Sequence, residues 1–273
     1  MPCERTRYQE RIVEVGMYFE HEGARLYYDR QGSGAPLLML HGWGGRADSF
    51  LPAIRDFQAV RTVYAVDFPG HGNSPEPPEP WSVTEYMELI RAFIRRMGIE
   101  GTDIMAHSFG GRVALLLAAT YPEAVGKMVL TGCAGLRPKP SGKKKARTRV
   151  YRALRALADN GLTRRLCPKT VERTREALVQ KFGSPDYRQL SPAMRRTFNR
   201  VIAQDLQPCL RRIQASTLLI WGTEDRDTPL WMGETMEREI PDAALIRFEG
   251  AGHFAYLDRY GEFRAIAWKF LIG

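Results

Sequence analysis

The sequence predicts an α/β fold in which a mostly parallel sheet of eight strands has helices on both faces. Three observations predict it. Several short segments are apolar almost throughout, as strands are when helices cover both of their faces. These segments alternate with stretches of helical periodicity, an order typical of a doubly wound parallel sheet. The 273 residues, 44% of them hydrophobic, suffice for one large core.

The sheet is expected to begin with a hairpin. Residues 13–19 and 24–30 interleave β-branched or aromatic residues with polar ones, and the turn Glu22-Gly23 separates them. Segments 36–40 and 62–66 are apolar almost throughout and are interpreted as interior parallel strands. Four further strands of this kind are predicted at residues 103–106, 127–131, 217–221 and 245–248.

Helical patterns lie between these strands, at residues 82–97, 110–121, 230–239 and 259–271. The first begins with a capping box, because Ser82 is followed three residues later by Glu85.

One segment interrupts the alternation after the sixth strand, and its pattern predicts helices only. Ser191-Pro192 opens one of its helices. Another has a shared apolar face, made of Val150, Leu154, Leu157 and Ala158. We therefore expect a core domain made of residues 1–134 and 213–273, with residues 135–212 inserted as an all-helical cap.

The insertion is also strongly basic. It holds 21 Lys and Arg against five acidic residues, whereas the rest of the chain holds 19 against 26. A field of that sign attracts an acidic substrate, an acidic protein, anionic lipid or nucleic acid. A solvated, solubilising surface is the alternative interpretation.

Composition excludes several classes of protein. No apolar run approaches the roughly 18 residues of a membrane-spanning helix, and the first residues do not resemble a signal peptide, so a cytoplasmic protein is expected. The cysteines contain no Cys-x-x-Cys pair, which argues against a zinc site or a disulfide framework. They are Cys3, Cys133, Cys167 and Cys209.

A candidate nucleophile lies where a predicted strand passes directly into a predicted helix, in the segment Ala-His-Ser-Phe-Gly-Gly at 106–111. A sharp turn there lifts the Ser108 hydroxyl above the sheet, places it at the positive end of the helix, and requires small neighbours. Gly110 and Gly111 meet that requirement, and Ala106 stands where glycine is usual.

A serine needs a base that is itself oriented by an acid, and in this architecture the order along the chain is Ser, Asp or Glu, His. Only His253 of the five histidines follows the serine, so it is the candidate base. His41 and His71 are interpreted as loop residues with satisfied hydrogen bonds. The carboxylates that precede His253 after a predicted strand are Glu224, Asp225 and Asp227.

A candidate oxyanion hole lies upstream. The loop His-Gly-Trp-Gly-Gly at 41–45 follows a buried strand, so the backbone N–H of Trp43 can point at a developing oxyanion together with that of Phe109.

In combination these motifs resemble the α/β-hydrolase fold serine hydrolases, over residues 24–271 apart from the insertion. The segment 67–74, Asp-Phe-Pro-Gly-His-Gly-Asn-Ser, is similar to the family's loop after its fourth strand, and Gly222-x-x-Asp225-x-x-x-Pro229 resembles its acid loop. By this resemblance Ser108 is the nucleophile, Asp225 the acid and His253 the base. Glu224 and Asp227 stay as alternatives for the acid.

Two branches of the family fit less well. Dehalogenases and epoxide hydrolases carry aspartate at the nucleophile position, where this chain has Ser108. Some lipases place the acid after strand six, where Gly132-Cys133-Ala134 offers no carboxylate.

The resemblance implies an esterase that works through an acyl-enzyme on a small to medium acyl ester and requires no metal or organic cofactor. A C–C bond hydrolase or a lipase-like enzyme is the alternative within the fold, and a non-catalytic ligand-binding or receptor-like protein is the alternative of another class. The basic cap and the His-Gly-Trp-Gly motif also resemble carrier-protein methyl ester carboxylesterases, so an acidic carrier protein is a candidate partner, with an anionic lipid surface as the other. Nucleic acid is not expected, because no recognised binding motif is present.

Overall fold

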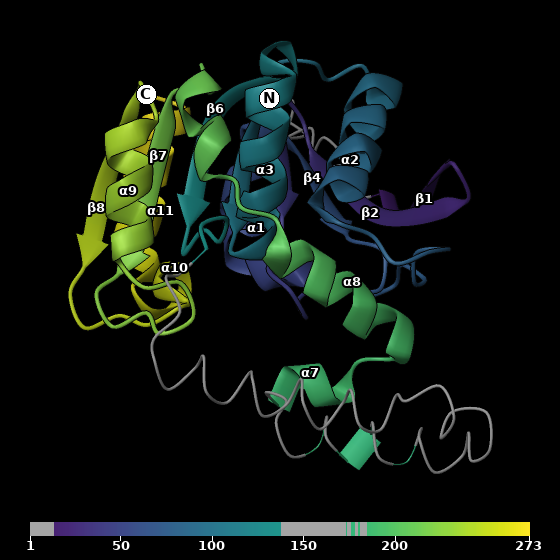
Figure 1. Cartoon of the computed structure of the whole chain (residues 1–273). Coiled ribbons are helices and arrows are strands. Elements are labelled where there is room, and N and C mark those ends of the chain that lie inside the picture. Colours follow the sequence, from purple (N-terminus) through teal and green to yellow (C-terminus); the bar gives the residue numbers. More distant parts are fainter. Residues whose placement is uncertain (1–13, 138–172, 174–175, 178–179, 181–184) are drawn as a thin grey trace, which may run out of the picture.

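The structure, a computed structural model, describes residues 14–137, 173, 176–177, 180 and 185–273. Eight strands form a single sheet (Figure 1). They are β1 Glu14–His21, β2 Ala24–Gly32, β3 Ala35–Leu40, β4 Arg61–Asp67, β5 Thr102–His107, β6 Val125–Thr131, β7 Thr217–Gly222 and β8 Ala243–Phe248. Each predicted strand is present, with ends that differ by a residue or two.

The topology confirms the mostly parallel sheet. Its strand order is β1-β2-β4-β3-β5-β6-β7-β8. β1 and β2 form the predicted antiparallel hairpin, and its turn has positive φ at both Glu22 (48°) and Gly23 (77°), as in a two-residue turn of type I′. β2 also runs antiparallel to β4, and all other neighbouring strands are parallel.

Helices cover both faces of the sheet. The helices α2 Val83–Met97, α3 Phe109–Thr120 and α9 Trp231–Glu239 pack on one face, and α1 Leu51–Phe57 and α11 Tyr260–Leu271 pack on the other. Side chains along β3 alternate between the two hydrophobic clusters, Leu38 and Leu40 in one and Leu37 and Met39 in the other. This two-sided burial is why the interior strands are apolar almost throughout.

The helix between β3 and β4 is missing from the sequence prediction. A parallel crossover needs a connection, and α1 provides it, preceded by the short 3-10 helix Ala47–Phe50. With only seven residues and Pro52 in its first turn, α1 shows less than two full turns of helical periodicity.

The described part of the insertion is helical. It contains α7 Pro185–Gln189 and α8 Pro192–Ala203, followed by the 3-10 helix Gln207–Arg212. α8 begins where predicted, because Ser191 Oγ accepts a hydrogen bond from the N–H of Met194 at 3.1 Å. The other predicted helix, with Val150, Leu154, Leu157 and Ala158, lies outside the described residues, and the boundaries of the predicted cap stay a prediction.

Main-chain groups at the end of the insertion are hydrogen-bonded to the core. Nη1 of the buried Arg112, on α3, donates to the carbonyl oxygens of Val201 (3.3 Å) and Gln204 (3.0 Å) at the end of α8. The N–H of Leu206 donates to the carbonyl of Gly135 at 3.0 Å. α8 therefore lies on the side of the molecule to which the arrowheads of β6 and β8 point, together with α10 Ala255–Asp258 (Figure 1).

Within the parts of the chain that the structure describes, none of the helices combines the length and the apolar character that crossing a membrane demands.

Candidate active site

Ser108 alone makes the turn between β5, which ends at His107, and α3, which begins at Phe109. Its backbone has φ 48° and ψ −105°, a conformation that a non-glycine residue keeps only when its surroundings hold it. The Ser108 N–H donates to the carbonyl of Thr131 at 3.1 Å, and its own carbonyl accepts from the N–H of Ala134 at 3.0 Å. These bonds present the half-buried serine side chain at the carboxyl end of the sheet.

The neighbours of this turn are small because backbone and sulfur atoms crowd it. A Cβ on Gly110 would lie 2.1 Å from the carbonyl oxygen of Leu40, and one on Gly111 would lie 2.3 Å from Sγ of Cys133. Ala106, where glycine is usual, is fully buried and does not have a positive φ. The alanine therefore fits without the conformational freedom of glycine.

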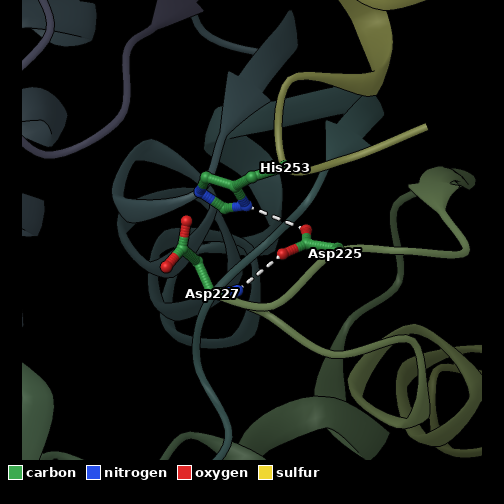
Figure 2. A group of neighbouring side chains, drawn as sticks. All are labelled: Asp225, Asp227 and His253. Carbon is green, nitrogen blue, oxygen red and sulfur yellow. Dashed lines mark hydrogen bonds and ion pairs between the residues drawn. The ribbon is translucent and has the colours of Figure 1, made fainter.

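Asp225 and His253 form a hydrogen-bonded pair (Figure 2). Oδ2 of Asp225 lies 2.8 Å from Nδ1 of His253, and the two residues come from the loops that follow β7 and β8. A carboxylate can only accept, so Nδ1 carries the proton of the neutral imidazole and Nε2 keeps a lone pair. This is the tautomer that a general base requires.

Three further hydrogen bonds reach the buried Asp225 carboxylate. Oδ1 accepts from the N–H of Asp227 at 2.9 Å and of Thr228 at 2.8 Å, and Oδ2 lies 2.7 Å from Oγ1 of Thr228. Burial acts to raise the pKa of Asp225, but the hydrogen bonds and the charge of His253 outweigh it, so that the pKa lies below its ordinary value. The acid therefore stays ionised.

The loop after β3 is fixed by the fully buried His41. Its Nδ1 donates to the carbonyl of Gly42 at 2.7 Å, and its Nε2 accepts from the N–H of Phe68 at 3.0 Å. Burial lowers the pKa of His41 to about 3, so the ring stays neutral and both bonds persist. The Gly42 carbonyl also accepts from the N–H of Gly45 at 3.0 Å. Because C=O and N–H of a trans peptide point in opposite directions, the N–H of Trp43 points away from His41.

Both residues predicted to supply oxyanion donors belong to segments that adjoin the serine: Phe109 follows it directly, and a Cβ on Gly42, the residue before Trp43, would lie 3.4 Å from Cβ of Ser108. The N–H of Phe109 is the first of α3 and that of Trp43 belongs to a turn, and neither has a hydrogen-bond partner among the described residues. The Gly110 N–H donates to the carbonyl of His41 at 3.0 Å, which ties the Trp43 loop to the start of α3.

The serine and the imidazole flank the same short segment. Ser108 bonds to residues on either side of Gly132, and a Cβ on Gly132 would lie 3.2 Å from Nδ1 of His253. No hydrogen bond of the described residues joins Ser108 Oγ to His253. Catalytic hydrogen bonds are often long without substrate and tighten when substrate binds, so the lack of this bond is compatible with catalysis.

Comparison with known proteins identifies the family. Residues 37–266 match the alpha/beta hydrolase family. The chain belongs to this family. Among its relatives, 2-hydroxymuconate semialdehyde hydrolase of Pseudomonas putida is 29% identical over 266 residues, which cover 94% of each chain. Pimeloyl-[acyl-carrier protein] methyl ester esterase of Chromobacterium violaceum is 27% identical over 258 residues, covering 89% of this chain and 96% of the relative.

A solved structure agrees on the fold of this alpha/beta hydrolase. An esterase from Exiguobacterium antarcticum superposes with a TM-score of 0.72 at 21% identity, covering 95% of this chain and 100% of the esterase. The predicted resemblance to the α/β hydrolases and the predicted fold class are thereby confirmed.

Thr228 is the site residue of this alpha/beta hydrolase that sequence reasoning missed. Its Oγ1 lies 2.7 Å from Asp225 Oδ2, 3.0 Å from the carbonyl oxygen of Gly132 and 3.2 Å from Nδ1 of His253. A hydroxyl has one proton, so it serves one of the two oxygen acceptors at a time. The available signal was a small polar residue directly before Pro229 in the acid loop.

The alternative acids are placed differently. The side chains of Asp227 and Glu224 are exposed, and neither forms a hydrogen bond to the imidazole. Figure 2 shows the Asp227 carboxylate beside the ring of His253, on the far side from Asp225.

Asp225, Asp227 and His253 are also the one group in the described ranges whose ligand atoms gather closely enough for a metal ion, within 4.8 Å of one another. Both oxygens of Asp225 already accept hydrogen bonds, one of them from Nδ1 of His253. A metal ion using those atoms would break the Asp–His bond. The geometry therefore fits an acid–base pair better than a metal centre.

Proposed function

We propose that this alpha/beta hydrolase is a serine esterase in which Ser108 is the nucleophile, His253 the base and Asp225 the acid. The observation that carries the proposal is the 2.8 Å hydrogen bond between the buried Asp225 and His253, beside a serine in a positive-φ turn. A structural serine would not need the strained turn, and a structural histidine would not need an ionised, buried partner.

In the proposed reaction His253 takes the Ser108 proton as Oγ attacks the ester carbonyl. The carbonyl oxygen becomes an oxyanion that accepts from the N–H groups of Trp43 and Phe109, each worth about 3–4 kcal/mol in comparable sites. Asp225 stabilises the imidazolium, which then protonates the departing alcohol. Water, activated by the same imidazole, hydrolyses the acyl-enzyme and frees Ser108.

The deciding experiment measures hydrolysis of p-nitrophenyl esters from acetyl to dodecanoyl. We expect the wild type to turn over at least one chain length and Ser108→Ala to lose that activity, while Ser33→Ala, at an exposed serine, keeps it. Loss in both serine variants, or equal turnover by Ser108→Ala, would contradict the proposal. Inactivity of the wild type on every ester would favour a binding protein or another chemistry.

C–C bond hydrolysis is the second candidate, because the Pseudomonas putida relative, 29% identical over 94% of the chain, is a 2-hydroxymuconate semialdehyde hydrolase. The same nucleophile, base and oxyanion donors serve both reactions. Absorbance assays with 2-hydroxymuconate semialdehyde and with the best ester, each with wild type and Ser108→Ala, rank the two by kcat/KM.

For the basic insertion we propose an acidic carrier protein as the source of the acyl ester. Its 21 basic and five acidic residues support this, as does the similarity to the esterase of Chromobacterium violaceum that is named for a carrier-protein ester. A carrier-bound methyl ester should be hydrolysed faster than the matching free methyl ester, and the difference should shrink as salt increases. Preference for anionic vesicles over the carrier would instead favour a lipid surface.

A further inference from the structure

His107 is a buried histidine that the proposed chemistry does not use. It is the last residue of β5, directly before Ser108, and only 3% of it is exposed. Its ring centre lies 4.7 Å from that of His253, 5.0 Å from that of Phe254 and 5.1 Å from that of Tyr256. The ring is therefore held between the nucleophile turn and the loop that carries the base.

The hydrogen bond of His107 fixes its tautomer. Nε2 lies 3.0 Å from the main-chain oxygen of His253, which can only accept, so the proton is on Nε2. Burial is the largest cause that lowers the pKa of His107, to about 3, so the ring stays neutral and this bond persists near neutral pH.

The other edge of the ring faces the oxyanion loop. A Cβ on Gly42 would lie 2.6 Å from Nδ1 of His107 and 3.4 Å from Cβ of Ser108. Gly42 is the residue whose carbonyl orientation directs the N–H of Trp43. One neutral ring thus contacts the base loop and the oxyanion loop, and the chain leads directly from it to the serine.

We infer that His107 is a positioning residue, which holds the main chain of His253 at its working distance from Ser108 through the Nε2–H bond. This inference rests on the proposed esterase chemistry. His253 lies in a loop. Among the described residues its side chain is hydrogen-bonded to one other loop, which carries Asp225 and Thr228. The bond from His107 adds a main-chain anchor on the side of the nucleophile, and a misplacement of about 1 Å in such a pair costs roughly 100-fold in rate.

Two variants separate the hydrogen bond from the bulk of the ring. His107→Phe keeps a ring without a donor, and His107→Gln keeps a side-chain N–H donor of similar reach. The first measurement is the second-order rate at which a p-nitrophenyl phosphonate phosphonylates the active-site serine, read as nitrophenolate release. The second is kcat and KM with the best p-nitrophenyl ester, and thermal unfolding reports whether each variant is folded.

We expect His107→Phe to lower both the phosphonylation rate and kcat by roughly 100-fold with KM nearly unchanged, and His107→Gln to recover at least a tenth of the wild-type values. Wild-type rates in His107→Phe, or equal losses in both variants, would overturn the positioning role. Should His107→Phe not fold, His107→Met replaces it as the donor-free variant. A wild type that the phosphonate does not label would overturn the esterase proposal itself, and the role given to His107 with it.

Discussion

Oδ2 of Asp225 lies 2.8 Å from Nδ1 of His253, whereas the carboxylate of Asp227, two residues later, is exposed and bonds to neither ring nitrogen. The two acids stand in one loop and differ in burial and in direction. They therefore form a natural pair for testing which carboxylate orients the imidazole.

Asp225→Asn should lower kcat by about 10⁴-fold, because an amide that donates to Nδ1 stabilises the wrong tautomer of His253. Asp227→Asn is the matched control and should leave kcat nearly unchanged, since its side chain makes no hydrogen bond to His253. Steady-state kinetics on the best ester decide between them. Equal losses in the two variants would return Asp227 to consideration as the acid.

Thr228→Val should destabilise the protein by about 1–3 kcal/mol, because it leaves a buried oxygen of Asp225 or Gly132 without its donor. Thr228→Ser keeps the hydroxyl and should retain most of the stability. The free energy of unfolding in urea is the measurement. If valine and serine variants unfold alike, the hydroxyl contributes little.

Gly132→Ala should impair catalysis as well as stability. Gly132 has φ 47°, and a Cβ there would lie 3.0 Å from the main-chain oxygen of His253 and 3.2 Å from Oδ2 of Asp225. Gly98→Ala is the control, with φ 64° and open space around the added Cβ. Backbone strain should lower the free energy of unfolding of both variants by about 1–2 kcal/mol, and only Gly132→Ala should also lower kcat. An unchanged kcat in Gly132→Ala would show that the Asp–His pair tolerates displacement.

Much of this site was predictable from the order of residues along the chain. The strand-to-helix turn at Ser108 and the late position of His253 are local or sequential signals. Tertiary contacts leave no such signal in the sequence. Nothing local to Thr228 shows that its hydroxyl meets the carbonyl of Gly132, 96 positions away in the chain. The interpretation of His41 as a satisfied loop residue agrees with its two hydrogen bonds, but Nε2 of the buried His71 has no partner among the described residues.

Lowering the pH below about 6 should lower the free energy of unfolding. Burial lowers the pKa of His41 to about 3, that of His71 to about 4 and that of His107 to about 3. Between about pH 6 and pH 5 the unfolded chain therefore binds protons at these positions while the folded chain does not, so stability falls as pH falls. The three together give at most roughly 4 kcal/mol per pH unit.

Urea unfolding at pH 7, 6, 5 and 4.5 measures that slope, and His71→Gln should reduce it by roughly a third. A slope that stays near zero down to pH 4.5 would mean that these rings protonate in the folded protein.

The hydrogen bond between the carbonyl of Gly135 and the N–H of Leu206 has a consequence for how the chain tolerates changes in length. Because this bond holds Gly135 beside Leu206, the segment between them forms a loop whose ends stay together whatever its length. The entropic cost of closing such a loop grows only with the logarithm of its length. Arg112 donates to the main-chain oxygens of Val201 and Gln204, so this link does not depend on their side chains, whereas the Gln204 side chain makes its own bond to the N–H of Val83. A change in the length of the segment between Gly135 and Leu206 therefore costs little loop-closure free energy, and Ser108, Asp225 and His253 all lie outside that segment.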